Sequence, residues 1–198
     1  MKDIVIIQYN AGNVRSVLFA LERLGVHATL TGDHQRIRQA DKVIFPGVGE
    51  ASSTMSYLHH HGLDEVIRSL TQPVLGICLG MQLLCTHSEE NDTQCLGIIP
   101  QQVRRFIPRS QAEHKVPHMG WNAIQRKPES FLPASVDGQY VYFVHSYYAE
   151  NGPYTAATCD YIVPFSAAMQ IDNFVATQFH PEKSGTVGAR ILEQFINA

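Results

Sequence analysis

The 198-residue sequence contains no long hydrophobic run and no long run of basic residues. Its apolar stretches are shorter than the roughly 18 residues that a membrane-spanning helix needs, so we expect no membrane span. Lysine and arginine total 15 against 18 acidic residues, and at most two basic residues stand together, which disfavours a nucleic-acid-binding surface. The apolar run at residues 4–7 is too short for the core of a secretory signal peptide.

Cysteine is scarce, with only Cys78, Cys85, Cys95 and Cys159, and no two of these form a C-x-x-C pair. Without a recognisable secretion signal, this pattern indicates reduced thiols in a cytoplasmic protein rather than a disulfide framework. Hydrophobic residues make up 44% of the chain and charged residues 17%, as is usual for a globular protein. We expect a single domain over residues 1–198.

Strand-like and helix-like segments alternate in the first half of the chain. The sequence predicts strands at 4–9, 27–31, 42–45 and 74–77, and helices at 14–24, 51–61, 63–70 and 79–86. The second half contains mainly strands, at 97–106, 122–126, 139–144, 154–160, 167–171 and 174–179, before a last helix at 184–197. The pattern predicts an α/β fold with a mixed, mostly parallel central sheet flanked by helices and with additional antiparallel strands in the second half.

Cys78 is the central residue of a G-x-C-x-G run at residues 76–80, between a predicted strand and a predicted helix. This is the cysteine form of the nucleophile elbow, in which two glycines allow a tight turn that exposes the central side chain. The N-terminus of the following helix presents free N–H groups and positive partial charge, which favour the reactive thiolate. Taken alone, the run is equally compatible with a buried structural cysteine, which is our interpretation of the other three.

His180 and Glu182 follow the predicted strand at 174–179, on either side of a proline. Residues two apart in an extended backbone point the same way, so we expect Glu182 to reach the His180 ring and fix its tautomer. The other ring nitrogen would then be available to exchange a proton with the thiol, as in a triad of nucleophile, base and orienter. The alternative is that His180 is an ordinary loop residue and that Glu182 is simply solvated. The position at a strand end disfavours it, because α/β sheets bind their ligands there.

A P-G-V-G run at residues 46–49 ends another predicted strand. Its glycines let the peptide at Val48 turn its N–H group toward a developing oxyanion, and the N–H group of Leu79 is the expected second donor. Taken alone, the run is an ordinary β-turn. The three histidines at 59–61 are not expected to bind a metal, because consecutive helix residues point in different directions.

Three runs together, at residues 46–49, 76–82 and 178–182, resemble the class I (triad-type) glutamine amidotransferases in order and spacing. Further stretches, at residues 9–13, 117–122, 145–148 and 180–184, resemble the glutaminase subunits of histidine biosynthesis within that family. The resemblance covers essentially the whole chain. It implies the flavodoxin-like fold of the family and a reaction with no metal and no cofactor.

The resemblance also implies a role for each matching residue. Cys78 would attack the side-chain amide of glutamine, and the N–H groups of Val48 and Leu79 would hold the oxyanion. His180, oriented by Glu182, would protonate the departing ammonia and then activate the water that hydrolyses the γ-glutamyl thioester. The residues implied to bind the substrate are Gly47, Gly49, Gln82, Ser146 and Tyr147.

Ammonia would then pass to a separate (β/α)8-barrel cyclase subunit, so the resemblance implies a protein interface. Its implied residues are Asn10, Asn13, Met119, Trp121 and Lys183. An exposed tryptophan and methionine fit the composition of a protein contact, whereas packing in the core is the alternative for Met119.

Rival functions stay open at this point. Another amidotransferase branch, such as the glutaminase of pyridoxal phosphate or anthranilate synthesis, is disfavoured by the stretches at 117–122 and 145–148. A cysteine peptidase or a γ-glutamyl hydrolase on a similar fold is a more distant alternative. A non-enzymatic thiol sensor would use the same elbow but needs no histidine and glutamate beside it, so His180 and Glu182 disfavour that function.

Overall fold

The structure is a computed structural model, and it describes residues 2–9, 14–108 and 115–198. The helices are α1 (Val14–Arg23), α2 (His34–Gln39), α3 (Ala51–His60), α4 (Leu63–Arg68), α5 (Leu79–Leu84) and α6 (Gly185–Asn197). The first seven strands are β1 (Ile4–Ile7), β2 (Ala28–Thr31), β3 (Lys42–Gly47), β4 (Val74–Cys78), β5 (His87–Ser88), β6 (Thr93–Gln94) and β7 (Gln102–Arg105). The others are β8 (His118–Ala123), β9 (Gln125–Arg126), β10 (Tyr140–His145), β11 (Tyr147–Ala149), β12 (Thr155–Asp160), β13 (Pro164–Ile171) and β14 (Phe174–Thr177).

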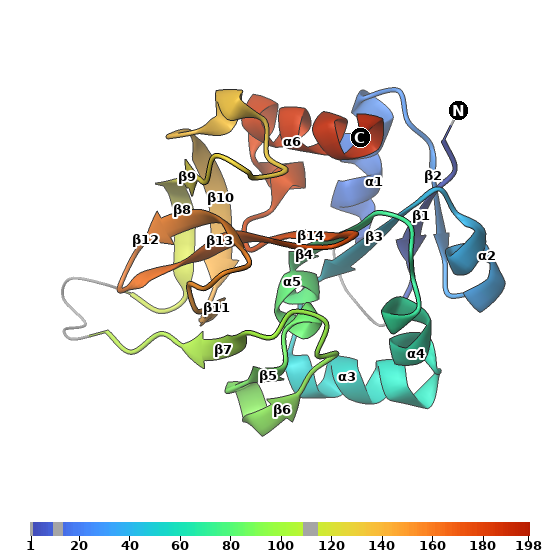
Figure 1. The fold of residues 1–198 in the computed structure, drawn as a ribbon, viewed down its shortest axis with the longest axis horizontal. Coiled ribbons are helices and arrows are strands. Elements are labelled where there is room, and N and C mark those ends of the chain that lie inside the picture. Colours follow the sequence, from blue (N-terminus) through green and yellow to red (C-terminus); the bar gives the residue numbers. More distant parts are fainter. Residues whose placement is uncertain (1, 10–13, 109–114) are drawn as a thin grey trace.

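Eight strands form the main sheet in the order β2-β1-β3-β4-β14-β13-β12-β9. The neighbours from β2 to β14 pair in parallel, and those from β14 to β9 pair antiparallel. Helices α1 and α6 lie on one side of this sheet, and α3, α4 and α5 lie on the other (Figure 1). The predicted fold class, a mixed sheet flanked by helices with antiparallel strands added late, is therefore confirmed.

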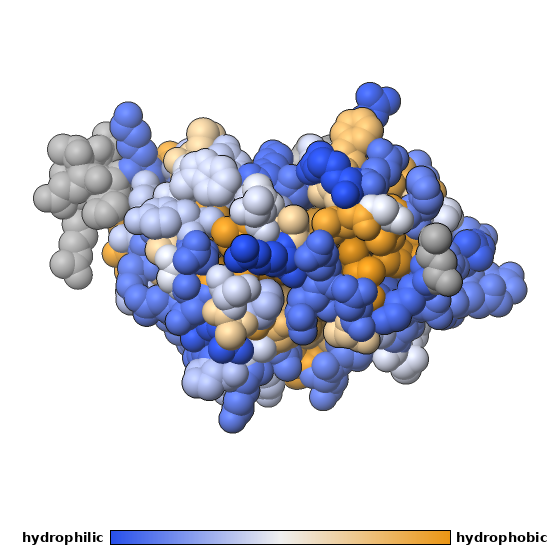
Figure 2. Space-filling model, turned by 90° about the horizontal axis from the view of Figure 1, so that it is seen from above, coloured by the Kyte–Doolittle hydropathy of each residue, from blue (hydrophilic) through white to orange (hydrophobic). Residues whose placement is uncertain are grey.

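The central strands are apolar because helices cover both of their faces. Every residue of β1, β3 and β4 is buried, whereas the edge strand β2 has none that is fully buried. Strands buried on both faces read as continuous hydrophobic runs, which explains why these segments were recognisable in the sequence. Seen from above, the surface is mostly hydrophilic, and hydrophobic residues gather in one area of it (Figure 2).

Two small sheets extend the second half of the chain. Strands β8 and β10 form an antiparallel pair, and the other sheet has the order β11-β7-β5-β6. Here the predicted boundaries were less accurate. The strand predicted at 97–106 covers only Gln102–Arg105, and the run that was expected to start at 122 begins at His118.

The short helix α2 was not predicted. It has six residues with a single buried apolar one, Ile37, so it carries too little periodicity to be recognised. Its N-terminal signal was present, since Asp33 caps the helix by accepting a hydrogen bond from the backbone N–H of Arg36. None of the helices in the described residues has both the length and the apolar character needed to cross a membrane. The single-domain assignment over 1–198 stays a prediction.

Candidate active site

The ends of three adjacent strands bring the predicted catalytic segments together. In the parallel register of β3 and β4, Gly47 pairs with Cys78. In the register of β14 and β4, Thr177 pairs with Ile77, so His180 follows three residues beyond the same edge of the sheet. Carboxyl ends of neighbouring parallel strands are where open α/β sheets bind ligands. Sheet topology thus joins segments that are about one hundred residues apart in sequence.

Cys78 has the backbone conformation of a strained elbow. It is the last residue of β4 and directly precedes α5, with φ 53° and ψ −108°. A non-glycine residue in such a conformation costs about 1–3 kcal/mol and persists only where the surroundings enforce it. The turn therefore forces the side chain of Cys78 out from the line of the strand.

The glycines beside Cys78 act differently from our expectation. The positive φ belongs to Cys78 itself, and Gly76 and Gly80 are needed for close packing. A Cβ on Gly80 would lie 2.1 Å from the carbonyl oxygen of Phe45, and one on Gly76 would lie 2.9 Å from Leu84 Cδ1. The glycines therefore let α5 rest directly on β3 and β4, and this contact holds the elbow in place.

His180 and Glu182 form a buried pair. The Nδ1 atom of His180 lies 2.8 Å from Oε1 of Glu182, and the two side chains are 1% and 2% exposed. The expected contact is present, but the backbone argument for it was wrong. Pro181–Lys183 is a short 3-10 helix rather than extended chain, and it folds Glu182 back onto the ring. Ser184 secures this turn by donating its hydroxyl to the carbonyl of His180 at 2.6 Å.

The charges around His180 favour its protonated form. Burial alone would lower the pKa of the ring, but the nearby Cys78 sulfur and the hydrogen-bonded Glu182 carboxylate outweigh burial and raise the pKa to about 10. The Nε2 atom is buried and has no hydrogen-bond partner among the described residues. A protonated ring therefore presents a free Nε2–H group to any molecule that reacts at the Cys78 sulfur.

A pocket of about 330 Å³ opens at this point. Among the predicted site residues, its lining includes Val48, Gly49, Cys78, Leu79, Gln82, Ser146, Tyr147 and His180. Gly47 is not part of the lining. A Cβ there would lie 2.6 Å from the backbone nitrogen of Gly80, so Gly47 permits close packing beneath the elbow. The roles assigned to all these residues stay predictions.

Two residues near this pocket had no assigned role in the sequence interpretation. Glu90 lines the pocket, and its Oε2 atom accepts a hydrogen bond from the backbone N–H of Ala51 at 2.8 Å. Burial raises the pKa of Glu90. Nothing in the sequence distinguishes Glu90 from the neighbouring acidic residues at 89 and 92. Gln178 was noticed only as part of a motif, and its Nε2 atom lies 3.7 Å from Sγ of Cys78.

Three of the predicted interface residues lie close together on one surface. Met119 and Trp121 on β8 are 63% and 55% exposed, so the core alternative for Met119 is wrong. The Trp121 ring lies 6.1 Å from that of Tyr142, and Nζ of Lys183 lies 5.8 Å from the Tyr142 ring centre. We call Met119, Trp121, Tyr142 and Lys183 the β8–β10 outer face. The other two interface predictions, Asn10 and Asn13, lie outside the described residues.

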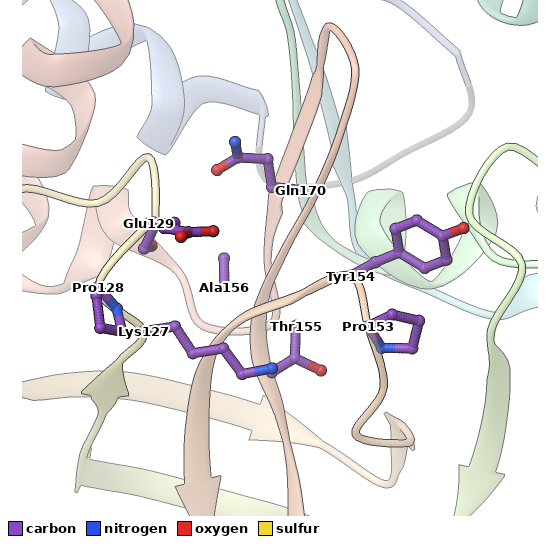
Figure 3. Close-up of a pocket in the computed structure, with 9 residues that line it drawn as sticks. Lys127, Pro128, Glu129, Pro153, Tyr154, Thr155, Ala156 and Gln170 are labelled. Atoms are coloured by element: carbon purple, nitrogen blue, oxygen red, sulfur yellow. The ribbon is translucent and has the colours of Figure 1, made fainter.

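A second pocket lies elsewhere in the molecule and has different chemistry. Its volume is about 280 Å³, and it shares no lining residue with the pocket at Cys78. Figure 3 shows the side chains of Lys127, Glu129 and Gln170 around it. Its lining contains no cysteine or histidine, so it lacks the pair of residue types found at the pocket of Cys78.

The consecutive histidines at the end of α3 have contacts of their own. Nδ1 of His59 lies 2.8 Å from Oδ2 of Asp64, which also pairs with Arg68 at 2.7 Å. The His61 ring packs on Tyr57 with centroids 4.1 Å apart. The rings of His59 and His61 therefore face different neighbours, and the His60 ring lies edge-on to that of His61, with centroids 5.0 Å apart. That these histidines bind no metal stays a prediction.

Comparisons with known proteins agree with this geometry. A family model described as "Glutamine amidotransferase class-I" matches residues 5–198. "Imidazole glycerol phosphate synthase subunit HisH" of Bacteroides thetaiotaomicron is 55% identical over 194 residues, which is 98% of each chain. The protein of the same name from Pasteurella multocida is 47% identical over 197 residues, which is 99% of this chain and 98% of the relative.

Two solved structures share the fold. A crystal structure of a glutamine amidotransferase matches with a TM-score of 0.74 at 19% identity, and the match covers 98% of this chain and 97% of the other. The structure of PurLQS from Thermotoga maritima matches with a TM-score of 0.69 at 14% identity, over 100% and 99% of the two chains. At such low identity these likenesses concern the fold alone.

Proposed function

The chain belongs to the class I glutamine amidotransferase family, and on this basis we propose that it is the glutaminase subunit of an imidazole glycerol phosphate synthase. It hydrolyses glutamine to glutamate and ammonia and supplies that ammonia to histidine biosynthesis. The observation that carries the proposal is the buried pair of Glu182 and His180 beside Cys78, at the ends of adjacent parallel strands.

The first half of the reaction forms a covalent intermediate. The Cys78 thiolate adds to the side-chain carbonyl carbon of glutamine, and the carbonyl oxygen becomes an oxyanion held by the backbone N–H groups of Val48 and Leu79. The oxyanion then collapses and the carbon–nitrogen bond breaks. The proton on Nε2 of His180 passes to the leaving nitrogen, which departs as ammonia, and a γ-glutamyl thioester remains on the sulfur.

The second half regenerates the enzyme. Neutral His180 accepts a proton from water, and the resulting hydroxide attacks the thioester carbon. The carbon–sulfur bond then breaks, which releases glutamate and restores the thiolate beside the imidazolium. Glu182 keeps the ring in the orientation and tautomer that both halves require.

The other end of the pocket suits the amino-acid part of glutamine. The carboxylate of Glu90 offers a negative charge to the α-ammonium group, and the backbone of Ser146 and Tyr147 offers polar groups to the same end. Gln82 supports that backbone, since its side chain donates to the Tyr147 carbonyl at 2.9 Å. Gly49, with φ 121°, follows the proposed oxyanion donor, and a larger residue there would strain the turn.

The ammonia is consumed by a separate cyclase subunit, which we propose to be a (β/α)8 barrel that docks on the β8–β10 outer face. The exposed tryptophan and methionine of that face favour a protein contact, because aromatic residues and methionine are enriched in interfaces. Asn10 and Asn13 complete the proposed contact. We also propose a cytoplasmic location, which the four free cysteines support.

The rival functions lose support for specific reasons. Relatives at about half identity over nearly the whole chain carry the imidazole glycerol phosphate synthase name, which disfavours other amidotransferase branches. A thiol sensor leaves the buried ion pair of His180 and Glu182 unexplained, because burying two ionisable groups is costly without a function for them.

The test is a glutaminase assay with purified chain, with and without the cyclase subunit and its nucleotide ligand. We expect glutamate release to rise on adding the partner, and Cys78→Ala to abolish it while the far-ultraviolet circular dichroism spectrum is unchanged. Cys159→Ala is the matched control, because that thiol is also buried but lies away from the pocket. Full activity of Cys78→Ala would refute the mechanism, and full activity without partner would refute the coupled-subunit function.

A further inference from the structure

A chain of hydrogen bonds leads away from the nucleophile. The Nε2 atom of Gln178 donates to Sγ of Cys78 at 3.7 Å, and Oε1 of the same amide accepts from Nε2 of Gln82 at 2.9 Å. The second hydrogen on Nε2 of Gln82 goes to the backbone carbonyl of Tyr147, also at 2.9 Å. Cys78 is thereby connected, through two side-chain amides, to the backbone at the other end of the pocket.

Two histidines continue the chain from that carbonyl. The Nδ1 atom of His145 lies 2.7 Å from the carbonyl oxygen of Tyr147, and its Nε2 atom lies 3.0 Å from Nδ1 of His118. A carbonyl oxygen only accepts, so Nδ1 of His145 carries a hydrogen. In a neutral ring Nε2 then has to accept, which requires Nδ1 of His118 to be the donor. The direction of every hydrogen bond in the chain follows from these assignments.

The packing around both rings favours the neutral form that this assignment requires. His118 and His145 are 3% and 6% exposed, and His118 lies between the rings of Phe143 and Tyr161, stacked at 4.8 and 4.0 Å. Burial lowers the pKa of His118 to about 4 and that of His145 to about 3. Both rings are uncharged at neutral pH, and each needs one defined tautomer.

We propose that His118 and Gln178 are positioning residues of the glutaminase reaction, at the two ends of one hydrogen-bond chain. Gln178 orients the Cys78 sulfur by donating to it. His118 fixes His145, which holds the Tyr147 carbonyl beside the substrate's amino-acid end. The inference rests on the proposed function for the identity of the substrate, whereas the hydrogen-bond directions are independent of it.

The location of His118 connects this chain to the proposed docking surface. His118 is the first residue of β8, whose exposed Met119 and Trp121 belong to the β8–β10 outer face. His118 and His145 are also cross-strand partners in the β8–β10 register. The strand that a partner would contact is therefore the strand that orients the backbone beside the substrate.

The first experiment separates a positioning role of His118 from a structural one. His118→Phe keeps a ring in the stack but leaves Nε2 of His145 without its donor. A buried unpaired acceptor costs about 1–3 kcal/mol, so we expect KM for glutamine to rise about five- to one-hundred-fold, with a smaller change in kcat. His118→Asn, which presents an amide N–H near the position of Nδ1, should bring KM back toward the wild-type value.

Phe106→Leu is the packing control, since the Phe106 ring contacts both histidines, with centroids 6.5 and 5.3 Å away, and offers no hydrogen bond to the chain. We expect it to lower the melting temperature and leave KM unchanged. The proposal fails if His118→Phe leaves KM unchanged, if Phe106→Leu raises KM equally, or if His118→Asn brings no recovery. All variants are measured in the complex with the cyclase subunit.

The second experiment tests Gln178 without using glutamine. Gln178→Glu keeps the size of the side chain but replaces the donor to sulfur with a second acceptor. We expect iodoacetamide to alkylate Cys78 about tenfold more slowly at pH 7, since losing a hydrogen bond to a charged group costs about 1.5–3 kcal/mol. Gln94→Glu, at an exposed glutamine, should react like the wild type. An unchanged alkylation rate in Gln178→Glu would overturn the assignment.

A third measurement needs no variant for its result. Long-range ¹H–¹⁵N NMR spectra of the wild-type protein at pH 7 should show both histidines neutral, with the hydrogen on Nδ1. A charged ring, or a hydrogen on Nε2 of His145, would refute the chain even if every variant failed to fold. If the wild-type protein released no glutamate with its partner, the proposed function would fail while the NMR and alkylation results still decided the chain.

Discussion

Replacing Glu182 with glutamine tests how a buried carboxylate keeps His180 charged. The variant removes the negative charge but retains an oxygen able to accept the Nδ1–H bond, which is 2.8 Å long in the native protein. The native pKa of about 10, against 6.5 for a free histidine, corresponds to about 5 kcal/mol in favour of the imidazolium. Cys78 also raises this pKa, so the variant should lose only part of the shift.

The magnitude follows from the difference between a charged and a neutral hydrogen bond. Charged partners contribute about 1.5–3 kcal/mol and neutral ones about 0.5–1.5, so Glu182→Gln should lose about 1–1.5 kcal/mol. This predicts that the pKa of His180 falls by about one and that kcat/KM falls about tenfold. His180→Ala removes the acid and base entirely and should cost about 10²- to 10⁴-fold.

The assays are an NMR titration of the His180 ring and steady-state kinetics in the complex. Because the folded pKa lies above the unfolded value, the charged ring stabilises the fold fully below about pH 6.5, and this stabilisation is lost as the pH rises toward about 10. The loss should begin at the same pH in Glu182→Gln but end at a lower pH, because the substitution lowers only the folded pKa. An unchanged titration, or a rate loss as large as that of His180→Ala, would refute the reasoning.

Three further predictions concern other parts of the structure. Gly80→Ala should destabilise the protein by at least about 1–3 kcal/mol in urea unfolding, because its Cβ would meet the Phe45 carbonyl at 2.1 Å; an equally stable variant would contradict the packing argument. Trp121→Ala should weaken cyclase binding at least about tenfold in calorimetry. Leu30→Ala, at an exposed residue of the edge strand β2, should leave binding unchanged. Equal effects of the two variants would argue against the β8–β10 outer face as the docking surface. His118 and His145, with pKa values of about 4 and 3, take up protons between pH 6.5 and pH 5 only when the chain unfolds. The free energy of unfolding should therefore fall by up to about 2.7 kcal/mol per pH unit as the pH is lowered from 6.5 to 5. A constant free energy of unfolding over that range would show that the two rings are not neutral in the folded protein.

The catalytic segments were predictable because local signals mark them. Strands β3 and β4 are buried throughout and read as apolar runs, and the glycines around Cys78 stand out in the sequence. Sequence reasoning reached the correct pairing of His180 with Glu182 through the wrong backbone conformation. A 3-10 turn and an extended chain both bring these side chains together, so the residue spacing alone did not distinguish them.

The hydrogen-bond chain was not predictable from the sequence. Gln178 meets Gln82 only because β14 lies beside β4, and His118 meets His145 only because β8 pairs with β10. No local pattern in the sequence specifies such contacts. The pocket residue Glu90 was likewise hidden within an acidic stretch. Boundaries of the short strands were poor for a related reason, since two-residue strands such as β5 and β6 are defined by their partners rather than by their own composition.

The position of β14 also determines when the enzyme becomes competent during its synthesis. This strand comes last along the chain, yet it lies in the middle of the main sheet, between β4 and β13. Domains form only after their segments have left the ribosome, and translation proceeds from the N-terminus. Until Phe174–Thr177 inserts, β4 is an open edge and the nucleophile has neither its base nor its orienter. A polypeptide that ends before residue 174 would therefore carry the cysteine elbow without the proposed base and orienter, and it should not hydrolyse glutamine.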